Sequence, residues 1–493
     1  MPRTTVGLLA TLALAAAFLA ACGGAASPPA AASAPRAYYV SRAGDDRGPG
    51  TAERPWRTLE RVNRGRYGPG DRILLQGGAT FAGSIVLSPE TARTEPGRPL
   101  VIGSYGKGRA TIASPPGGNG ITVVNLGGVF VHRLAVVGPS AASGGSGVAV
   151  FNDSGRTLGG IRILDVEVEG QTSGILMLVG DRPSRLRDVR IGRVFAHDNA
   201  QGIALFGYLE PGRGYGLVDV RIRDARAFRN TGAGLEDGYG AGIFVLGADR
   251  LLVEGNRVRD NGGDNPSDPP NGPSGITVYV SRSVVVRGND ISGQRYDVRN
   301  QTDNGGLDVW ARDGLIEGNV IRGNEGWGLV LGSAAVQDPV AGADLSQDLT
   351  VRGNVVERNG CRLPDSEATE PHAGAAVLMF GQLERIALVG NTFSRDCSVP
   401  PGADPDAVQG VVYLVDVPGA GRPWRDIVLR KNRIAALGVP TLVEVPRPEA
   451  GSGLLLAGNE YEARGEGPRV KWGAKTFDDV RTWAEETGQE GGR

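Results

Sequence analysis

Lysine is almost absent from this chain of 493 residues, which carries only Lys107, Lys431, Lys471 and Lys475. Arginine supplies the positive charge instead, and 53 basic residues balance 54 acidic ones to a net charge of −1. Proteins that bind nucleic acid gather positive charge on one face, because contacts with phosphate supply much of their affinity. The near-neutral balance leaves no electrostatic case for nucleic acid, and we expect no such partner.

Aromatic residues are also scarce, at 6% of the chain, which suits a core built from valine, isoleucine and leucine. The leucine signature of leucine-rich repeats and the Trp-Asp signature of propellers are missing. The repeated region has no helical stretch long enough to connect two parallel strands. These absences argue against both of those repeat folds and against helical crossovers between strands.

What the chain does contain is a repeat with two markers. The first is a Gly-Asn pair between two short apolar alternations, at Gly255-Asn256, Gly288-Asn289, Gly318-Asn319, Gly353-Asn354 and Gly390-Asn391. The second is a leading Gly before an apolar residue, at Gly202-Ile203, Gly242-Ile243, Gly275-Ile276, Gly306-Leu307 and Gly328-Leu329. Repeats of about 20–50 residues predict a solenoid. Residues at one offset then lie above one another, about 4.8 Å apart.

Each repeat contains three short runs that alternate with period two, separated by turn residues. In one unit these runs are Gly275–Val280, Ser283–Arg287 and Asp290–Ser292. Three short strands per coil, stacked in parallel, predict an all-β fold. We expect a right-handed parallel β-helix of roughly eleven coils, because right-handed connection is the strong default.

The asparagine column resembles the Asn ladder of right-handed β-helices of the pectate-lyase type, which occupies the turn between the second and third strands. The start of the domain resembles the opening of many secreted members, at Tyr38–Ser41, Gly44–Asp46, Gly50-Thr51, Pro55–Leu59, Pro69–Asp71 and Phe81–Gly83. The resemblance covers about residues 38–490. It implies the architecture, a scaffold role for the asparagines, and substrate lying in a groove along the first strand of each coil.

Residues 1–22 read as an export signal rather than as part of the fold. Arg3 precedes an apolar stretch that is too short to span a membrane with its flanks. Leu19–Gly23 resembles the lipobox of bacterial lipoproteins, which implies cleavage before Cys22 and lipid attachment to its thiol. The alternative is an ordinary secretory signal. Residues 23–37 are rich in Ala, Ser and Pro and predict a flexible tether. We therefore expect export and lipid anchoring to the bacterial cell membrane or outer membrane.

The sequence also predicts the bounds of the solenoid and the helices that cap its two ends. Residues 38–475 form the predicted β-helix, and Thr58–Arg64 a short capping helix at its start. Residues 476–493 form the predicted capping helix and tail, with Thr476 as N-cap and Gly488 as stop. Solenoids need such caps because open strand edges pair with other chains.

Besides Cys22, the chain has two cysteines, Cys361 and Cys397, at nearly the same offset in neighbouring coils. In an oxidising space this spacing predicts a disulfide between the coils. Two free buried thiols are the alternative.

Aromatic residues gather on the outward side of the first strand. Counting the leading Gly as position zero, side chains at positions one and three point inward and those at two and four outward. Position four holds Phe206, Leu246, Tyr279 and Trp310 in successive coils, and Phe244 stands at position two. Such a column could be a platform for sugar rings. Alternatively, the loops fold over the column and bury it.

Asp308 is the first candidate catalytic residue, because it points outward on a first strand next to Trp310. Asp303 precedes it, and Glu236 and Asp237 lie on a loop before a neighbouring strand; His197 and Asp198 occur a coil earlier. Glycoside hydrolysis uses a pair of carboxylates, one as acid and the other as base or nucleophile. Gln301–Asp303 faintly resembles the Asn-Thr-Asp of polygalacturonases, but their other motifs are not present in order.

Elimination from a uronate needs a different set of residues, a basic side chain and neutralisation of the carboxylate, often by Ca²⁺. The scarcity of lysine argues against a lysine base. Candidate arginines and candidate Ca²⁺ ligands are Arg295, Arg299, Arg312, Glu236, Asp237, Asp264 and Asp268. No strict metal-loop spacing is visible, so Ca²⁺ is an open expectation and the metal residues are unknown.

Three functions stay open for the sequence. The first is a surface-anchored enzyme that cleaves an extracellular polysaccharide as a hydrolase or lyase. The second is a glycan-binding lipoprotein without catalysis, and the third is a structural protein of the cell envelope. The expected partner is a polysaccharide and the expected state a monomer.

Overall fold

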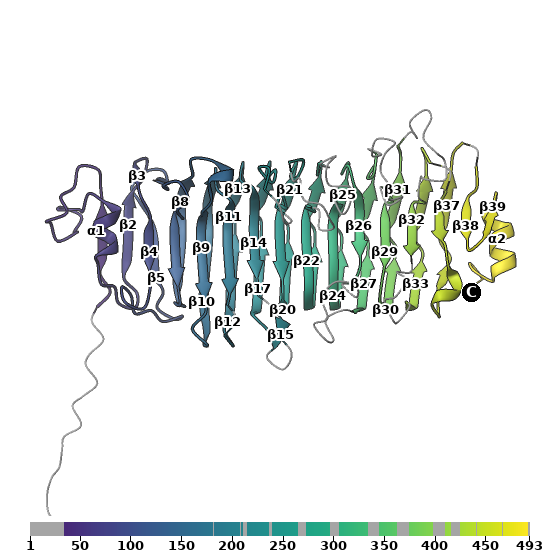
Figure 1. Ribbon diagram of the computed structural model, residues 1–493, viewed down its shortest axis with the longest axis horizontal. Coiled ribbons are helices and arrows are strands. Elements are labelled where there is room, and N and C mark those ends of the chain that lie inside the picture. Colours follow the sequence, from purple (N-terminus) through teal and green to yellow (C-terminus); the bar gives the residue numbers. More distant parts are fainter. Residues whose placement is uncertain are drawn as a thin grey trace, which may run out of the picture. The chain divides into compact units, whose positions relative to one another are not determined.

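The computed structural model of this chain is a parallel β-helix (Figure 1). The structure describes residues 34–180, 182–207, 209–210, 214–235, 239–264, 273–295, 305–333, 345–361, 374–397, 410–415, 424–439, 441–465 and 467–491. All the elements given below lie in the compact unit Pro35–Arg493. The helix has about 12 turns, close to the roughly eleven that the repeat predicts.

Three columns of stacked parallel strands build the coils. The first column begins each coil and contains β4 Ile85–Leu87, β7 Ile121–Val124, β9 Ser146–Asn152, β11 Ser173–Val179, β14 Gln201–Phe206, β19 Ile243–Leu246, the starts of β22 Ile276–Arg287 and β24 Gly305–Glu317, β26 Trp327–Leu331, β29 Val377–Phe380, β32 Val412–Val415, β35 Val443–Val445 and β38 Val470–Trp472.

The second column contains β1 Ala37–Val40, β2 Arg72–Gln76, β5 Leu100–Tyr105, the starts of β8 Val129–Val137 and β10 Thr157–Glu169, β12 Arg185–Gly192, β17 Leu217–Arg223, β20 Ala248–Glu254, the ends of β22 and β24, β27 Ser346–Arg352, β30 Leu383–Val389, β33 Arg425–Arg430 and β36 Leu455–Ala457. The third contains β3 Thr80–Ala82, β6 Ala110–Ala113, the ends of β8 and β10, β13 Phe195–His197, β18 Arg226–Phe228, β21 Arg257–Arg259, β23 Asp290–Ser292, β25 Val320–Arg322, β28 Val355–Glu357, β31 Thr392–Arg395, β34 Arg433–Ala436 and β37 Glu460–Ala463.

The predicted inward positions form the core of the solenoid. Ile203, Ile243 and Ile276 are consecutive register partners, and all three are fully buried. Val, Ile and Leu fill these rows because their side chains pack well on the face of a sheet. The alternation read from the sequence therefore predicted the register of these strands correctly.

A ladder of asparagines lies in the turn between the second and third strands, as the sequence predicts. Nδ2 of Asn256 donates to Oδ1 of Asn289, at 2.9 Å, and Asn289 donates likewise to Asn319. The ladder runs on through the predicted Asn354 and Asn391 and continues beyond the predicted members to Asn432 and Asn459. Buried backbone groups of each turn are satisfied in this way.

A second ladder, which the sequence analysis missed, lies between the third strand and the next coil. Its members are Asn199, Asn230, Asn261, Gln294, Asn324 and Asn359. Four of them stand five residues after a member of the first ladder, for example Asn261 after Asn256. That constant spacing is the signal that could have revealed them.

Short elements close the two ends of the β-helix. Helix α1, Leu59–Asn63, is the capping helix that the sequence predicts at the start of the solenoid, and Thr58 is its N-cap. Helix α2, Val480–Thr487, covers the last coils and ends at Gly488 (φ 71°), but its N-cap is Asp479. The predicted N-cap, Thr476, lies in β39 Lys475–Phe477, which pairs antiparallel with β38. The expected start was wrong because Phe477, whose spacing from Val480 and Trp483 suits a helix, belongs to the last strand.

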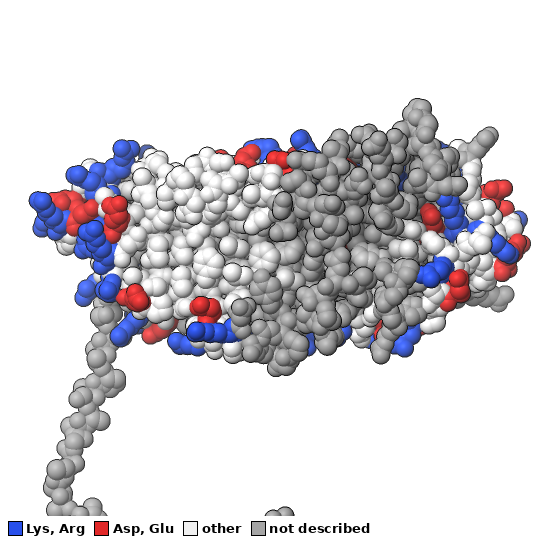
Figure 2. All heavy atoms as spheres, in the orientation of Figure 1, with Lys and Arg blue, Asp and Glu red and all other residues white. Residues whose placement is uncertain are grey.

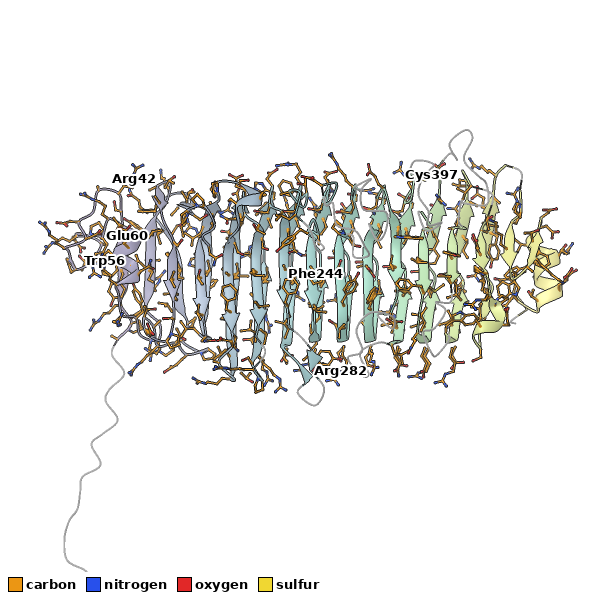
Figure 3. All side chains as sticks on the ribbon, in the orientation of Figure 1. Arg42, Trp56, Glu60, Phe244, Arg282 and Cys397 are labelled. Atoms are coloured by element: carbon orange, nitrogen blue, oxygen red, sulfur yellow. A yellow bond between two sulfur atoms is a disulfide. The ribbon has the colours of Figure 1, made fainter. Side chains whose placement is uncertain are left out.

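The predicted disulfide between Cys361 and Cys397 is present and joins neighbouring coils; Cys397 is labelled in Figure 3. Two short 3₁₀ helices, Ala141–Ser143 and Pro448–Ala450, and a hairpin of β15 Leu209–Glu210 with β16 Gly214–Tyr215 complete the described elements. Within the described residues, no helix has the length and apolar character needed to cross a membrane.

Candidate functional site

The outward side of the first strands forms a broad face with little charge. In Figure 2 the part of this face that is not grey is almost free of Lys, Arg, Asp and Glu, which lie along its edges. Two columns of side chains follow from the strand register. One runs through Ala204, Phe244, Thr277 and Asp308, and the other through Phe206, Leu246 and Tyr279.

Aromatic rings join these columns into one continuous line, which we call the aromatic row: Phe206, Phe244, Tyr279, Trp310 and Phe380. Ring centroids are 5.2 Å apart for Phe206 and Phe244, and 5.8 Å apart for Phe244 and Tyr279. Tyr279 stacks on Trp310 at 4.1 Å, and Trp310 meets Phe380 edge-on at 5.9 Å. The sequence predicted the first four members, and the structure adds Phe380.

Two local features, a β-bulge and a glycine, allow the rings to lie against one another. The register between β22 and β24 shifts after Val278, where Val280 adopts a left-handed conformation (φ 49°). Such bulges re-aim the neighbouring side chain, here that of Tyr279. Further along, Gly332 leaves room between two rings: a Cβ there would lie 2.6 Å from the Phe380 ring and 2.7 Å from Trp310 Nε1.

The row is neither open nor fully covered. Tyr279 is 9% exposed, whereas Phe206, Phe244, Trp310 and Phe380 are half-buried. The indole Nε1 of Trp310 is buried and finds no hydrogen-bond partner among the described residues. Of the two alternatives left by the sequence, platform or buried column, the structure shows a mixture, in which Tyr279 is packed away and its neighbours present part of their rings.

Asp308 lies in the middle of this row and is only 2% exposed. It accepts a hydrogen bond of 2.5 Å at Oδ2 from the hydroxyl of Tyr279. Its register neighbours, Thr277 and Val330, are buried as well. A carboxyl group is costly to bury unless polar partners compensate it. Asp308 is therefore not the solvated surface aspartate that its outward position alone suggests.

An apolar cluster outside the main core continues the row toward the C-terminus. Its buried members are Trp327, Val330, Ala375, Leu378 and Tyr413, with Phe380 and Val415 packed against them. This cluster lies outside the β-helix core, on the side where a ligand groove is expected. One of its members, Val330, is the register neighbour of Asp308.

Two of the candidate arginines lie within the described residues, and several other predicted site residues do not. Asp303, Glu236 and Asp237 lie outside the described residues, as do Asp268 and Arg299. Arg312 lies on the second-strand part of β24, where its charge acts on Tyr215. Arg295 donates its backbone N–H to Asn261 O, and its own carbonyl lies close to Gly262.

His197 and Asp198 lie on a different side of the coil, at the third strand. Nδ1 of His197 is 2.7 Å from Oδ2 of Asp198, and Nε2 lies 3.5 Å from Oε1 of Glu167. Potential metal-ligand atoms of Glu169, His197 and Asp198 fall within 4.8 Å of one another. However, Arg229 makes two hydrogen bonds to Asp198 and holds its pKa below the usual value. Because the guanidinium of Arg229 already pairs with Asp198, we interpret the group as an ion-pair cluster and not as a metal site.

Comparisons with known proteins agree with this architecture. The family model described as right handed beta helix region matches residues 220–400. A search of curated proteins finds no match. Among solved structures, a GH136 lacto-N-biosidase from Eubacterium ramulus has 18% identity and a TM-score of 0.55, covering 80% of this chain and 67% of its own.

A second structure, a mannuronan C-5 epimerase A-module from Azotobacter vinelandii, has 16% identity and a TM-score of 0.47, covering 81% of this chain and 90% of its own. At 18% identity, the likeness to the first structure shows the fold alone and leaves the activity open. The chain is thus a right-handed parallel β-helix, as its sequence predicts.

Proposed function

We propose that this protein binds a polysaccharide along its aromatic row and cleaves it there, with Asp308 as the group that transfers the proton. The observation that carries the proposal is the position of Asp308. It is a buried carboxyl group, outside the core, between aromatic residues and hydrogen-bonded to one of them. Sugars stack their C–H faces on aromatic rings, and most glycoside hydrolases transfer the proton through a carboxyl group.

Each part of the row has a role in this proposal. The half-buried rings of Phe206, Phe244 and Trp310 hold the sugars, while Trp310 Nε1 offers a buried donor for a sugar hydroxyl. Tyr279 orients the carboxyl group through its 2.5 Å hydrogen bond. A positioned acid or base contributes about 10²–10⁴-fold to the rate. A second carboxylate for hydrolysis would come from Asp303, Glu236 or Asp237, and this assignment is part of the proposal.

The test is to incubate the purified protein with neutral and uronic polysaccharides, first with Ca²⁺ and then with a chelator. Reducing ends and the absorbance of unsaturated products are both measured. We expect new reducing ends from at least one polysaccharide. Asp308→Asn, which keeps the shape and an acceptor for Tyr279, is expected to lower the rate by about 100-fold or more.

Asp313→Asn is the matched control for this substitution. Asp313 lies on the same strand and is exposed, and its left-handed backbone (φ 54°) suits asparagine. Its activity should stay at the wild-type level. Reducing ends together with the unsaturated chromophore would mean elimination and would contradict the hydrolytic roles of Asp303, Glu236 and Asp237. Binding without any cleavage would contradict the enzyme and support a glycan-binding protein.

A further inference from the structure

The first coils of this chain carry a charge that its near-neutral total conceals. Residues 34–133 hold 14 basic and seven acidic side chains, a net charge of +7 (14 − 7). Residues 134–493 hold 38 basic and 47 acidic ones, a net charge of −9 (38 − 47). Such asymmetry between two parts of one chain is typical of a protein that meets a polyanion or a membrane.

The far end of the β-helix has the opposite sign. Residues 442–493, which contain α2, hold seven basic and ten acidic side chains, a net charge of −3 (7 − 10). In Figure 2 the Lys and Arg side chains gather around the end where α1 lies, at the left of Figure 1. The β-helix is therefore basic where the chain enters it and acidic at the other end.

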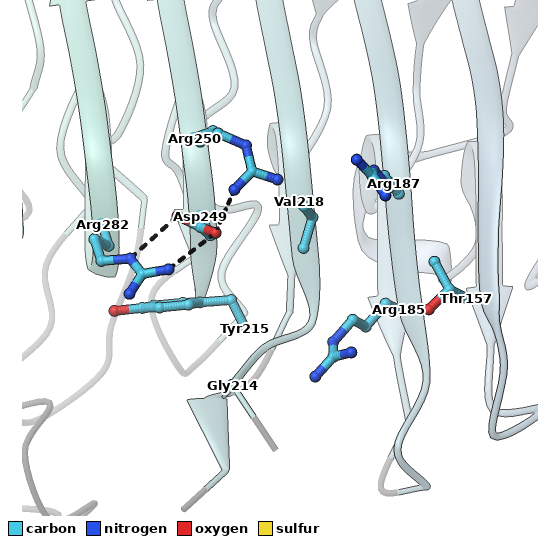
Figure 4. A pocket seen from close by; sticks show the side chains of 9 residues that line it. All are labelled: Thr157, Arg185, Arg187, Gly214, Tyr215, Val218, Asp249, Arg250 and Arg282. Atoms are coloured by element: carbon cyan, nitrogen blue, oxygen red, sulfur yellow. Dashed lines mark hydrogen bonds and ion pairs between the residues drawn. The ribbon is translucent and has the colours of Figure 1, made fainter. Parts of the chain in front are cut away.

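Ion pairs are rare among the basic side chains of the first coils. Residues 34–133 are all described, and of their 14 basic side chains only Arg109 forms an ion pair with any described residue, using two carboxylates of a later coil. Later coils differ: Arg250 and Arg282, for example, both pair with Asp249 (Figure 4). The positive charge of the first coils is thus left for the surroundings of the protein.

Two of the seven acidic side chains of the first coils are used inside the fold. Asp71 is buried and accepts from the backbone N–H groups of Arg36 and Gly68, at 2.7 and 2.8 Å. Asp46 accepts from the backbone and from the hydroxyl of Thr58. The other five are exposed: Asp45, Glu53, Glu60, Glu90 and Glu95. All seven are counted in the net charge of +7, which already includes their opposing effect.

The chain enters the β-helix among arginines. Arg36 lies just before β1, and its carbonyl accepts from the backbone N–H of Arg72, the first residue of β2, at 2.8 Å. Arg98 lies beside them, because a Cβ built on Gly70 would be 3.1 Å from Pro35 and 3.7 Å from Arg98 Nε. Three arginines therefore surround the point where the chain enters.

We propose that this basic end of the β-helix docks on the anionic lipid head groups of a membrane and holds the first coils toward the bilayer. Guanidinium groups match the paired oxygens of phosphate, and clusters of basic side chains bind membranes that contain anionic lipids. A membrane is favoured over other polyanions because the predicted lipid site, Cys22, precedes this end in the sequence.

The length of the intervening chain agrees with this orientation. The 15 residues from Gly23 to Ala37 can span at most about 50 Å. A lipid on Cys22 would therefore keep the basic end near the bilayer, whereas the acidic end lies about 12 turns away. Residues 1–33 contain one basic and no acidic residue, so the chain before this end adds no negative charge.

This inference goes beyond the proposed function, because it requires no cleavage. The test is co-sedimentation of residues 23–493, the predicted mature chain without its lipid, with vesicles of phosphatidylcholine alone or mixed equally with phosphatidylglycerol. This protein retains the compact unit Pro35–Arg493, which contains every described element. We expect the bound fraction to rise about fivefold or more with the anionic lipid. It should fall again as salt rises from about 20 to 200 mM, since exposed charges are screened.

A variant assigns the binding to the basic end. It combines Arg42→Gln, Arg47→Gln and Arg54→Gln, which lie between β1 and α1. These side chains are exposed and form no hydrogen bond or ion pair with the described residues, so their loss should not disturb the fold. We expect the affinity for the anionic vesicles to fall about tenfold or more.

The matched control removes the same charge from β17, β21 and β33, by combining Arg221→Gln, Arg257→Gln and Arg430→Gln. These side chains are also exposed and form no ion pair with the described residues. Because they lie on later coils, the control should change the affinity by less than about twofold.

Equal binding to both kinds of vesicle, or an equal loss in the control, would overturn the proposal. Inorganic phosphate, polygalacturonate and duplex DNA are added as competitors at matched ionic strength, and none should release the protein. Release by one of them, at a charge concentration below that of the lipid, would place that anion at the basic end instead. Sedimentation velocity without vesicles should show a monomer. Larger species that the Arg42, Arg47 and Arg54 variant abolishes would identify the acidic end of a second copy as the partner.

Discussion

At the scale of single residues, the row depends on a position that has no side chain. Gly332 lies between Trp310 and Phe380, and the two rings meet edge-on beside it. Phe380 was missed in the sequence because its coil lacks the leading Gly: Ala376 takes the place that Gly328 has in the coil before. A marker based on glycine cannot find a coil that has replaced it.

Gly332→Ala is expected to destabilise the protein by about 1–3 kcal/mol, the usual cost of overpacking a closed contact. The added Cβ would lie within 2.7 Å of both ring systems, so Trp310 or Phe380 must move. Urea unfolding monitored by tryptophan fluorescence measures the change. Gly97→Ala is the control, since nothing lies within 4 Å of a Cβ there. Equal stability of both variants would contradict the closed contact.

The burial of Asp308 shows what a sequence pattern cannot supply. Alternation predicted correctly that its side chain points away from the core. Burial depends instead on contacts with other coils, such as the hydrogen bond from Tyr279 and the register neighbour Val330. Such packing between distant residues leaves no periodic signal.

At the scale of elements, the two ladders fix the turns of each coil. The strands and the first ladder were predictable because every coil repeats the same turn chemistry, and the repeat reports it several times. The start of α2 was not, because the last coil occurs once and its strand β39 has no counterpart to compare with.

Asn319→Ala is expected to destabilise the protein by about 2–4 kcal/mol, because it leaves several buried groups without partners. Asn319 accepts from the backbone N–H and Nδ2 of Asn289, and it donates to Val286 O and Asn354 Oδ1. Hydrogen exchange should show faster exchange in these coils than in the coils around Asn199. A uniform change along the chain, or none, would contradict a local role of the ladder.

At the scale of the whole molecule, paired carboxylates tie the coils together on the surface. Asp198, Asp219, Asp348 and Glu462 each have a pKa below the usual value, chiefly because an arginine of another coil, respectively Arg229, Arg250, Arg385 and Arg433, donates hydrogen bonds to them. A lowered folded-state pKa means that these groups stabilise the fold fully above the unfolded-state pKa of about 4 and lose that effect as the pH falls through the folded-state values.

We therefore expect the urea midpoint to hold steady from about pH 7 to pH 5 and to fall below about pH 4. Asp198→Asn and Asp219→Asn together should make that decline shallower, because their protons are then no longer taken up on unfolding. High salt should have a similar effect, since these pairs are exposed and screened. A midpoint that rises on acidification would contradict this account.

The predicted anchor concerns the whole molecule as well. Cys22 lies outside the described residues, and lipid attachment there remains a proposal drawn from the sequence. In detergent phase separation the protein from cells should enter the detergent phase, and Cys22→Ser should move it to the aqueous phase. Mass spectrometry of the mature N-terminus provides the check. An unmodified N-terminus after an ordinary signal cleavage would contradict the anchor.

In the last coil the asparagine ladder ends on a glutamate, Glu490. The carboxylate of Glu490 accepts from both the backbone N–H and Nδ2 of Asn459, and from the hydroxyl of Tyr461. Each asparagine of the ladder is at once an acceptor for the coil before and a donor to the coil after, so the pattern by itself would allow growth without limit. A carboxylate accepts but cannot donate. Glu490 thus ends the ladder, and a second molecule cannot extend it by stacking its own asparagines on this coil to form a fibre.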